Sequence, residues 1–312
     1  MKPIVLITGE SHPILASALV QMGYEVIDSP QISRIELMEQ VSSVAGLVLT
    51  SRHHIDADVF AKAEKLQWIG RLGSGLDVID LSIAQSKGVS VYSSPEGNRQ
   101  AVAEHTLGLL MNLIRNQSRS DKEVRQGIWN RNENRGYELS SLTMGIIGYG
   151  NTGEAVSRAL TSLGMRVLAY DKYRFGYGGE WAVETDMETI RKEADVVSLH
   201  LPLTAETIGL VDDVWLEAFT KSIWLINTSR GAITPLEPLI RQLESGRLRG
   251  LALDVLPKEP LKNYSTEEQQ ALNKLCAFEQ VVLTPHIAGY TQESPERMAR
   301  VLLDKLGAGL GG

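Results

Sequence analysis

The sequence has a single cysteine, Cys276, and aromatic residues make up only 6% of it. One cysteine excludes an internal disulfide and leaves no partner thiolate for a metal site, which suits a reducing cytosol. We predict that the thiol of Cys276 is buried and inert, and we predict no metal site.

Positive charge is also scarce, since 31 Lys and Arg residues stand against 38 Asp and Glu residues, for a formal net charge of −7. This balance disfavours general binding to nucleic-acid backbones or anionic membranes. Residues 4–7 form too short an apolar run for a secretory signal, and no run approaches the roughly 18 residues of a membrane span. We expect a cytoplasmic protein that binds neither nucleic acid nor membranes.

The 312 residues, of which 43% are hydrophobic, are enough to build two domains. Short β-branched runs alternate with helical patterns that are long enough for crossover connections. The predicted strands are residues 4–7, 24–27, 47–49, 68–69 and 89–92, followed by 144–147, 167–170, 196–199, 223–226, 251–253 and 281–283. We therefore predict an α/β fold with two doubly wound parallel-sheet domains.

The domain boundaries are predicted from where these two strand series begin and end. The first domain is expected at residues 1–98 and the second at 99–284, while 285–312 returns to the first domain. Helical patterns at 100–116 and 295–306 would join the two domains. Two chain crossings of this kind are compatible with a hinged cleft.

The strongest motif is G-Y-G-N-T-G at residues 148–153, which follows an apolar strand and opens a helical pattern. In this fingerprint Gly148 permits a tight turn, Gly150 lets a pyrophosphate approach the backbone, and Gly153 allows close helix-to-strand packing. Backbone amides at the helix start, including those of Asn151 and Thr152, would face the phosphates. The second domain is thus predicted to be a Rossmann dinucleotide-binding domain.

An acidic residue stands where such a domain places its ribose ligand. Asp171 ends the next predicted strand, 21 residues beyond Gly150. Its carboxylate would accept hydrogen bonds from a 2′-hydroxyl and repel a 2′-phosphate, which favours NAD over NADP. Lys172 and Arg174 keep some use of NADP open.

Three candidate catalytic residues follow three successive strands of the second domain: Arg230, Glu259 and His286. Ligands in open α/β sheets bind at the carboxyl ends of strands. A guanidinium suits bidentate binding of a carboxylate, and an imidazole beside a carboxylate can exchange a proton near neutral pH. Taken singly, Arg230 and Glu259 are better explained as loop charges and His286 as a structural residue at a strand end. The prediction therefore rests on their shared position at one edge of the sheet.

The first domain contains a second glycine pair, Gly73 and Gly75 around Ser74, in which Val78 replaces a third glycine. This turn is therefore not a second dinucleotide site. Its backbone amides can cradle a small anion such as a carboxylate, although a purely structural turn explains the residues nearly as well.

Over nearly its whole length the sequence resembles the D-2-hydroxyacid dehydrogenase family. The matching segments are residues 73–77 (GSGLD), 102–105 (VAEH), 148–153, 200–204 (HLPLT), 227–231 (NTSRG), 253–255 (LDV) and 284–286 (TPH). The resemblance implies an NAD-dependent oxidoreductase with a flavodoxin-like substrate domain.

The resemblance also implies roles for individual residues. Arg230 would bind the substrate acid, His286 would be the acid/base, and Glu259 would orient and charge that histidine. Asp254 would hold the nicotinamide carboxamide, and Ser74 and Gly75 would offer backbone amides to the substrate. The further residues expected at the cofactor are His200, Pro202 and Thr228.

Within the family, residues 64–71 (EKLQWIGR) and 94–98 (SPEGN) look most like the 3-phosphoglycerate dehydrogenases of serine biosynthesis. Asn98 would then lie at the substrate, and Arg52 and Arg71 are cations available for its phosphate. Thr50 and Ala288 depart from the usual arginine and glycine. Because 26 residues follow His286, we expect no C-terminal regulatory domain. Glyoxylate, hydroxypyruvate or D-lactate-type substrates remain alternatives, as does an NADH-sensing binding protein that resembles the family's corepressors.

The segment 120–134 resembles the family's dimerisation arm, with Val124, Ile128 and Trp129 among charged residues. We therefore expect a homodimer, with an amphipathic core helix as the alternative.

Overall fold

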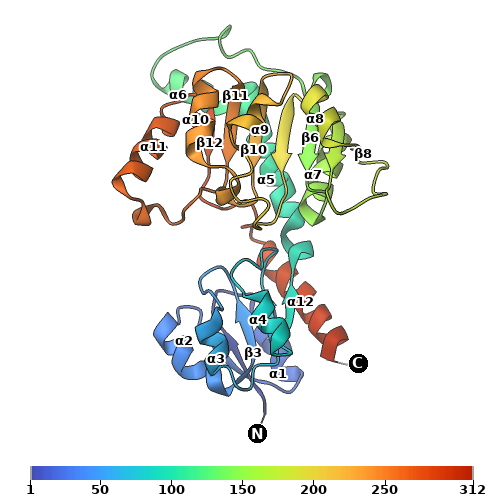
Figure 1. Cartoon of the computed structure of the whole chain (residues 1–312), viewed down its shortest axis with the longest axis vertical. Coiled ribbons are helices and arrows are strands. Elements are labelled where there is room, and N and C mark those ends of the chain that lie inside the picture. Colours follow the sequence, from blue (N-terminus) through green and yellow to red (C-terminus); the bar gives the residue numbers. More distant parts are fainter. Residues whose placement is uncertain (1, 311–312) are drawn as a thin grey trace. The chain divides into compact units, whose positions relative to one another are not determined.

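The computed structural model describes residues 2–310, which fall into two compact units. The first unit contains the residues up to Ala101 together with those from Gly289 onward, and the second unit is Val102–Ala288. The chain therefore passes between the units twice, once inside helix α5 (Pro95–Arg115) and once after Ala288 (Figure 1).

The first unit is built on a five-stranded parallel sheet in the order β2-β1-β3-β4-β5. This is the flavodoxin-like order, so the predicted fold of this unit is confirmed. Its strands are β1 (Ile4–Ile7), β2 (Glu25–Asp28), β3 (Val44–Leu49), β4 (Trp68–Arg71) and β5 (Ser90–Ser93). Its first four helices are α1 (Pro13–Gln21), α2 (Arg34–Gln40), α3 (Ala57–Lys62) and α4 (Leu81–Ser86).

The last helix, α12 (Ser294–Leu310), contributes to the core of the first unit. Its Leu302 and Leu306 are fully buried in one cluster with Leu15 and Leu19 of α1. The fit is close at the sheet, since a Cβ on Gly70 would lie 2.7 Å from a methyl carbon of Leu302. The C-terminal residues thus stabilise a sheet formed by the N-terminal ones.

The second unit is built on a seven-stranded parallel sheet in the order β12-β11-β10-β9-β6-β7-β8. The predicted Rossmann fold is confirmed, because the sheet grows in both directions from β6. Its strands are β6 (Thr143–Ile147), β7 (Arg166–Tyr170), β8 (Val183–Glu184), β9 (Val196–Leu199), β10 (Ile223–Asn227), β11 (Leu248–Leu253) and β12 (Val281–Leu283). Besides α5, its helices are α6 (Gln117–Arg125), α7 (Asn151–Ser162), α8 (Met187–Glu193), α9 (Asp213–Glu217), α10 (Leu236–Glu244) and α11 (Thr266–Cys276).

Two predictions from the sequence are wrong in detail. The connecting helix α5 begins at Pro95 rather than at residue 100, because proline is favoured at a first helical position and Glu96 suits the positive helix start. Cys276 is exposed rather than buried, since Leu272 and Leu275 take the buried positions of α11.

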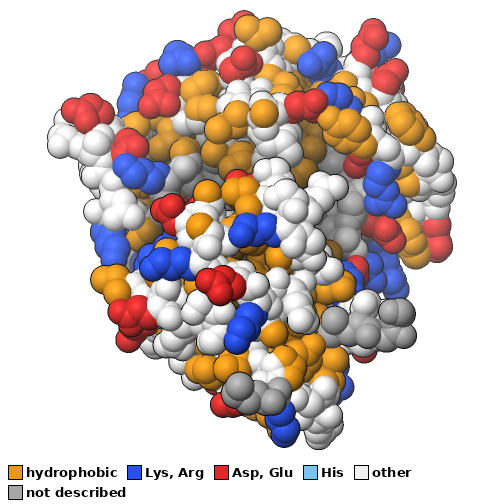
Figure 2. All heavy atoms as spheres, turned by 60° about the horizontal axis from the view of Figure 1, so that its bottom comes forward, with side chains coloured by type: hydrophobic (Ala, Val, Ile, Leu, Met, Phe, Trp, Pro, Cys, Tyr) orange, Lys and Arg blue, Asp and Glu red, His pale blue; other side chains and the backbone are white. Residues whose placement is uncertain are grey.

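On the face shown in Figure 2, Lys and Arg side chains are interspersed with Asp and Glu side chains. Within residues 2–310, no helix combines the length and the hydropathy needed to cross a membrane.

Candidate active site

The glycine motif forms the turn between β6 and α7, and each glycine meets a different constraint. Gly148 has a φ of +92°, and a Cβ there would lie 2.3 Å from the carbonyl oxygen of His200. A Cβ on Gly153 would lie 2.2 Å from the carbonyl oxygen of Gly148. A Cβ on Gly150 would meet no atom within 4 Å. The chain itself therefore requires two glycines, whereas the third leaves an open approach to the backbone.

The start of α7 offers backbone donors beside this opening. Gly150 is the N-cap and provides no side-chain hydrogen bond to the helix. The amides of Asn151, Thr152 and Gly153 lie in the first turn, where helical N–H groups have no acceptor within the helix. Unpaired donors at a positive helix end fit the pyrophosphate of a dinucleotide.

Asp171 lies directly after β7, and its side chain links the end of this strand to the glycine turn by a hydrogen bond. Its Oδ2 accepts a hydrogen bond from the amide of Tyr149 at 2.8 Å. Its Oδ1 accepts the amides of Tyr173 and Arg174 at 2.9 and 3.0 Å. The predicted ribose ligand therefore lies beside the turn that it was expected to serve.

The two basic residues next to Asp171 have partners of their own. Lys172 Nζ is 2.7 Å from Glu206 Oε2, and the Arg174 guanidinium donates to the carbonyl oxygen of Tyr149. Neither cation needs a 2′-phosphate as its partner, which agrees with a preference for NAD.

Replacing Asp171 with alanine is expected to reduce the preference for NAD over NADP about tenfold or more, since a carboxylate that repels a 2′-phosphate is lost. The measurement is the ratio of kcat/KM for the two cofactors. The matched control is Asp186→Ala, which removes an N-cap carboxylate from α8 and leaves the glycine turn intact. An equal loss with both cofactors would assign Asp171 a purely structural role.

His200 packs against the glycine turn at Gly148. Its side chain is buried, Nε2 is 2.9 Å from Ser198 Oγ, and burial lowers the pKa of the imidazole to about 4. The ring is therefore neutral at neutral pH, and it is the backbone of His200 that limits Gly148. Of the other expected cofactor residues, Pro202 is exposed on the following loop and Thr228 has its hydroxyl 3.3 Å from that of Thr106.

The loop that carries Arg230 is shaped by Asn227, the fully buried last residue of β10. The side-chain amide nitrogen of Asn227 donates to the carbonyl of Arg230 at 3.0 Å and to Thr234 Oγ1 at 2.9 Å. The side-chain oxygen of Asn227 accepts a hydrogen bond from the backbone amide of Ser229 at 2.9 Å. The next residue, Gly231, lies so close to Leu256 that a Cβ would approach the Leu256 carbonyl to 1.9 Å. The loops after β10 and β11 are thus in direct contact.

Glu259 and His286 form the hydrogen-bonded pair that the sequence predicted. His286 Nδ1 is 2.7 Å from Glu259 Oε2, and Glu259 Oε1 accepts the amide of Leu256 at 2.9 Å. Burial opposes ionisation of Glu259, but these two hydrogen bonds outweigh it and hold the pKa of the carboxyl below its ordinary value of 4.5. The pair therefore stabilises the fold above that pH, and this contribution is lost as the pH falls through the lowered pKa.

Asp254, at the end of β11, is 1% exposed. Its carboxylate accepts hydrogen bonds from Thr284 Oγ1 at 2.5 Å and from the amides of Ile287 and Ala288 at 2.9 and 2.8 Å. The side chain expected at the nicotinamide carboxamide thus already holds two consecutive backbone amides, those that follow His286.

The substrate residues expected in the first unit follow three neighbouring strands. Arg52 lies after β3, Ser74 and Gly75 lie after β4, and Asn98 lies in the first turn of α5, which follows β5. Parallel strands end at one edge of a sheet, so these residues share that edge. Arg71 ends β4 and its guanidinium donates to the Leu72 carbonyl, close to Gly73.

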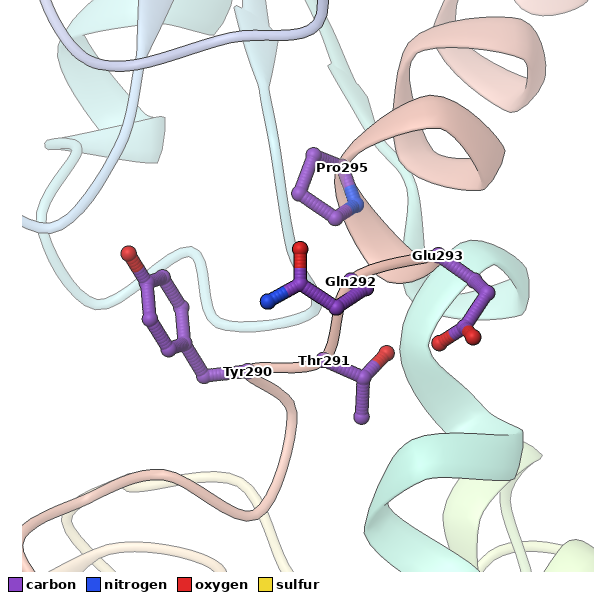
Figure 3. Close-up of a pocket in the computed structure, with 5 residues that line it drawn as sticks. All are labelled: Tyr290, Thr291, Gln292, Glu293 and Pro295. Atoms are coloured by element: carbon purple, nitrogen blue, oxygen red, sulfur yellow. The ribbon is translucent and has the colours of Figure 1, made fainter.

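A surface hollow of the first unit is lined by Tyr290, Thr291, Gln292, Glu293 and Pro295, just before and at the start of α12. Tyr290 and Gln292 project to one side of this segment and Glu293 to the other (Figure 3). None of the predicted catalytic residues lines this hollow.

Comparison with known proteins identifies the family of this chain. Residues 107–288 match the model of the D-isomer specific 2-hydroxyacid dehydrogenase NAD-binding domain. A D-3-phosphoglycerate dehydrogenase of Pongo abelii is 33% identical over 298 residues, 94% of this chain and 54% of the relative, so the chain spans about half of that protein. A glyoxylate reductase of Thermofilum pendens is 35% identical over 292 residues, 90% of this chain and 82% of the relative.

Among solved structures, the D-lactate dehydrogenase of Aquifex aeolicus, in complex with NAD and lactic acid, superposes with a TM-score of 0.85 and 26% identity. The match covers 99% of this chain and 97% of that one. By the family model and the relative from Thermofilum pendens, the chain belongs to the D-2-hydroxyacid dehydrogenase family, and its second unit is an NAD-binding domain.

Proposed function

We propose that this chain catalyses the NAD-dependent interconversion of a D-2-hydroxy acid and its 2-keto acid. The observation that carries the proposal is the 2.7 Å contact between Glu259 and His286. Arg230 follows β10, Glu259 follows β11 and His286 follows β12. These three strands are neighbours in the sheet that also contains β6, which leads into the glycine turn. An acid/base pair, a guanidinium and a dinucleotide turn are the groups that this reaction needs.

The residues divide the reaction among them. His286 uses Nδ1 for Glu259, which leaves Nε2 to take the proton of the substrate hydroxyl. Glu259 stabilises the imidazolium that forms. Arg230 binds the substrate carboxylate and polarises the carbonyl group that forms at carbon 2. NAD, when bound along the glycine turn, supplies the acceptor for the hydride that leaves carbon 2.

We propose 3-phosphoglycerate as the substrate, which would place the reaction in serine biosynthesis. The relative from Pongo abelii is named D-3-phosphoglycerate dehydrogenase. In the first unit, Arg52 and Arg71 lie at the carboxyl ends of strands β3 and β4, where they are available to a phosphate group. A glyoxylate reductase and a D-lactate dehydrogenase are also among the similar proteins, and they define the alternatives.

The test is to follow NADH absorbance with purified protein and 3-phosphohydroxypyruvate, hydroxypyruvate, glyoxylate and pyruvate. The highest kcat/KM is expected for 3-phosphohydroxypyruvate, and Arg230→Lys should raise KM for every acid that reacts. Preference for another acid would correct the substrate and keep the reaction. Tight NADH binding without turnover of any acid would overturn the enzyme assignment in favour of a nucleotide-sensing binding protein.

We also propose that the chain is a homodimer through segment 120–134. The exposed fractions of Trp129 and Val124 are 76% and 53%, and α6 buries none of its described residues. Such apolar exposure favours a protein contact over solvent. Light scattering should give the mass of two chains, and Trp129→Ser should lower it toward one.

A further inference from the structure

We infer that His105 is a positioning residue that holds His286 in its working conformation through Thr284 and Asp254. The proposal rests on the proposed role of His286 as acid/base. His105 contacts Thr284, and Thr284 contacts Asp254, so His105 acts on His286 only indirectly. These contacts link helix α5 to the loop after β12.

The conformation of His286 is one that few residues adopt. Its φ is +56°, and among the described non-glycine residues only Asn116 shares a positive φ. The left-handed region is uncommon for side chains other than Asn, Asp and His, and it persists where surrounding contacts impose it. The direction of the imidazole therefore depends on whatever holds the backbone at this residue.

Asp254 holds that backbone at three consecutive amides. The amide of His286 donates to the Asp254 carbonyl at 2.7 Å. The next two amides, of Ile287 and Ala288, donate to the Asp254 carboxylate. The same aspartate is anchored in the sheet, because its own amide donates to the Asn227 carbonyl at 3.0 Å. One buried residue thus sets the path of the chain through His286.

A buried carboxylate can do this only if its charge is satisfied. Burial raises the cost of ionising Asp254, yet hydrogen bonds from His105, from Thr284 and from the two amides hold the pKa of its carboxyl below the ordinary value. Two side chains, those of His105 and Thr284, are therefore part of what keeps the anion in place.

The hydrogen-bond directions in this cluster are determined by counting protons. The Thr284 hydroxyl has one proton and lies 2.5 Å from Asp254 Oδ1, so it donates to the carboxylate. His105 Nε2 lies 3.0 Å from the same hydroxyl and 3.4 Å from Asp254 Oδ1. Nε2 must then carry a proton and donate, which makes His105 the outer donor of the chain His105–Thr284–Asp254.

The variants that test this are His105→Leu and Thr284→Val, each of which removes one donor and keeps an apolar side chain. Their matched controls are His105→Gln and Thr284→Ser, which keep a donor. The donor-free variants should lower kcat about 10- to 100-fold through misplacement of His286. The pH profile of kcat should shift with them, and the controls should recover most of the kcat.

A second readout does not depend on turnover. In proton NMR, the Nδ1 proton shared between His286 and Glu259 should give a far-downfield signal, assigned by its loss in Glu259→Gln. That signal should broaden or disappear in His105→Leu and Thr284→Val and persist in the two controls.

The outcomes separate this proposal from the proposed function. A wild-type chain that turns over no acid would refute the dehydrogenase assignment, while the NMR comparison would still test the positioning of His286. An unchanged NMR signal and unchanged pH profile in His105→Leu would overturn the positioning role. Equal losses in the donor-free variants and their controls would also overturn it, because they would indicate a packing effect alone.

Discussion

Replacing Gly150 with alanine should weaken NAD binding about 100-fold, because one or two charged hydrogen bonds worth about 1.5–3 kcal/mol each are lost. The chain itself has room for the methyl group, since a Cβ at this position meets no atom within 4 Å. The backbone of Gly150 has a φ of −90°, which alanine adopts without strain. The added methyl would therefore occupy the space through which the pyrophosphate reaches the amides of α7.

The measurements are the dissociation constant for NADH by fluorescence and the unfolding midpoint. We expect the midpoint of Gly150→Ala to stay at or above that of the wild type, because alanine narrows the unfolded ensemble. The matched control is Gly153→Ala, whose Cβ would lie 2.2 Å from the Gly148 carbonyl oxygen. That control should lose both stability and binding. Wild-type affinity in Gly150→Ala would show that the cofactor does not approach this glycine.

Replacing His286 with asparagine should lower kcat about 1000-fold, within the usual contribution of a general acid or base. Asparagine is the suitable substitution because it tolerates the left-handed conformation that His286 adopts at φ +56°. It removes the group that exchanges the proton and keeps a polar amide beside Glu259. Binding of NADH should change little, since the glycine turn is on a different strand.

Steady-state kinetics of His286→Asn at several pH values provide the check. Glu259→Gln is the companion variant, and it should lose less activity and alter the pH dependence of what remains, because it removes the charge that supports the imidazolium. More than a tenth of wild-type kcat in His286→Asn would eliminate His286 as the acid/base.

Much of the fold could be predicted from the sequence because both sheets are parallel and buried. Strands such as β6 and β10 are continuous apolar runs, and their crossover helices leave recognisable gaps between them. Strand β8 was missed, because two residues, Val183 and Glu184, form no hydrophobic pattern. The burial of Cys276 was mispredicted for a related reason: its neighbour Leu275 sits on the buried side of α11, and hydrophobic type alone does not say which side a residue faces.

The candidate site divides in the same way. The glycine turn and the Glu259–His286 pair could be predicted, since strand-end residues in a parallel sheet lie at one edge. The role of His105 could not, because 179 residues separate it from Thr284 and only the folded chain brings their side chains together. The motif at 102–105 was the available signal, but a histidine inside a helix does not disclose which distant hydroxyl it meets.

The contact between Gly231 and Leu256 has a consequence for attempts to redesign this protein. Any side chain at position 231 would drive into a neighbouring peptide group, and that peptide group leads directly to the proline-flanked turn bearing Glu259. The loop of Arg230, the proposed ligand of the substrate carboxylate, and the turn that bears Glu259 are therefore packed against each other, so a change in the backbone of one will displace the other. Libraries that vary the Arg230 loop should therefore leave Gly231 fixed, because its neighbours are backbone atoms that no side-chain substitution removes.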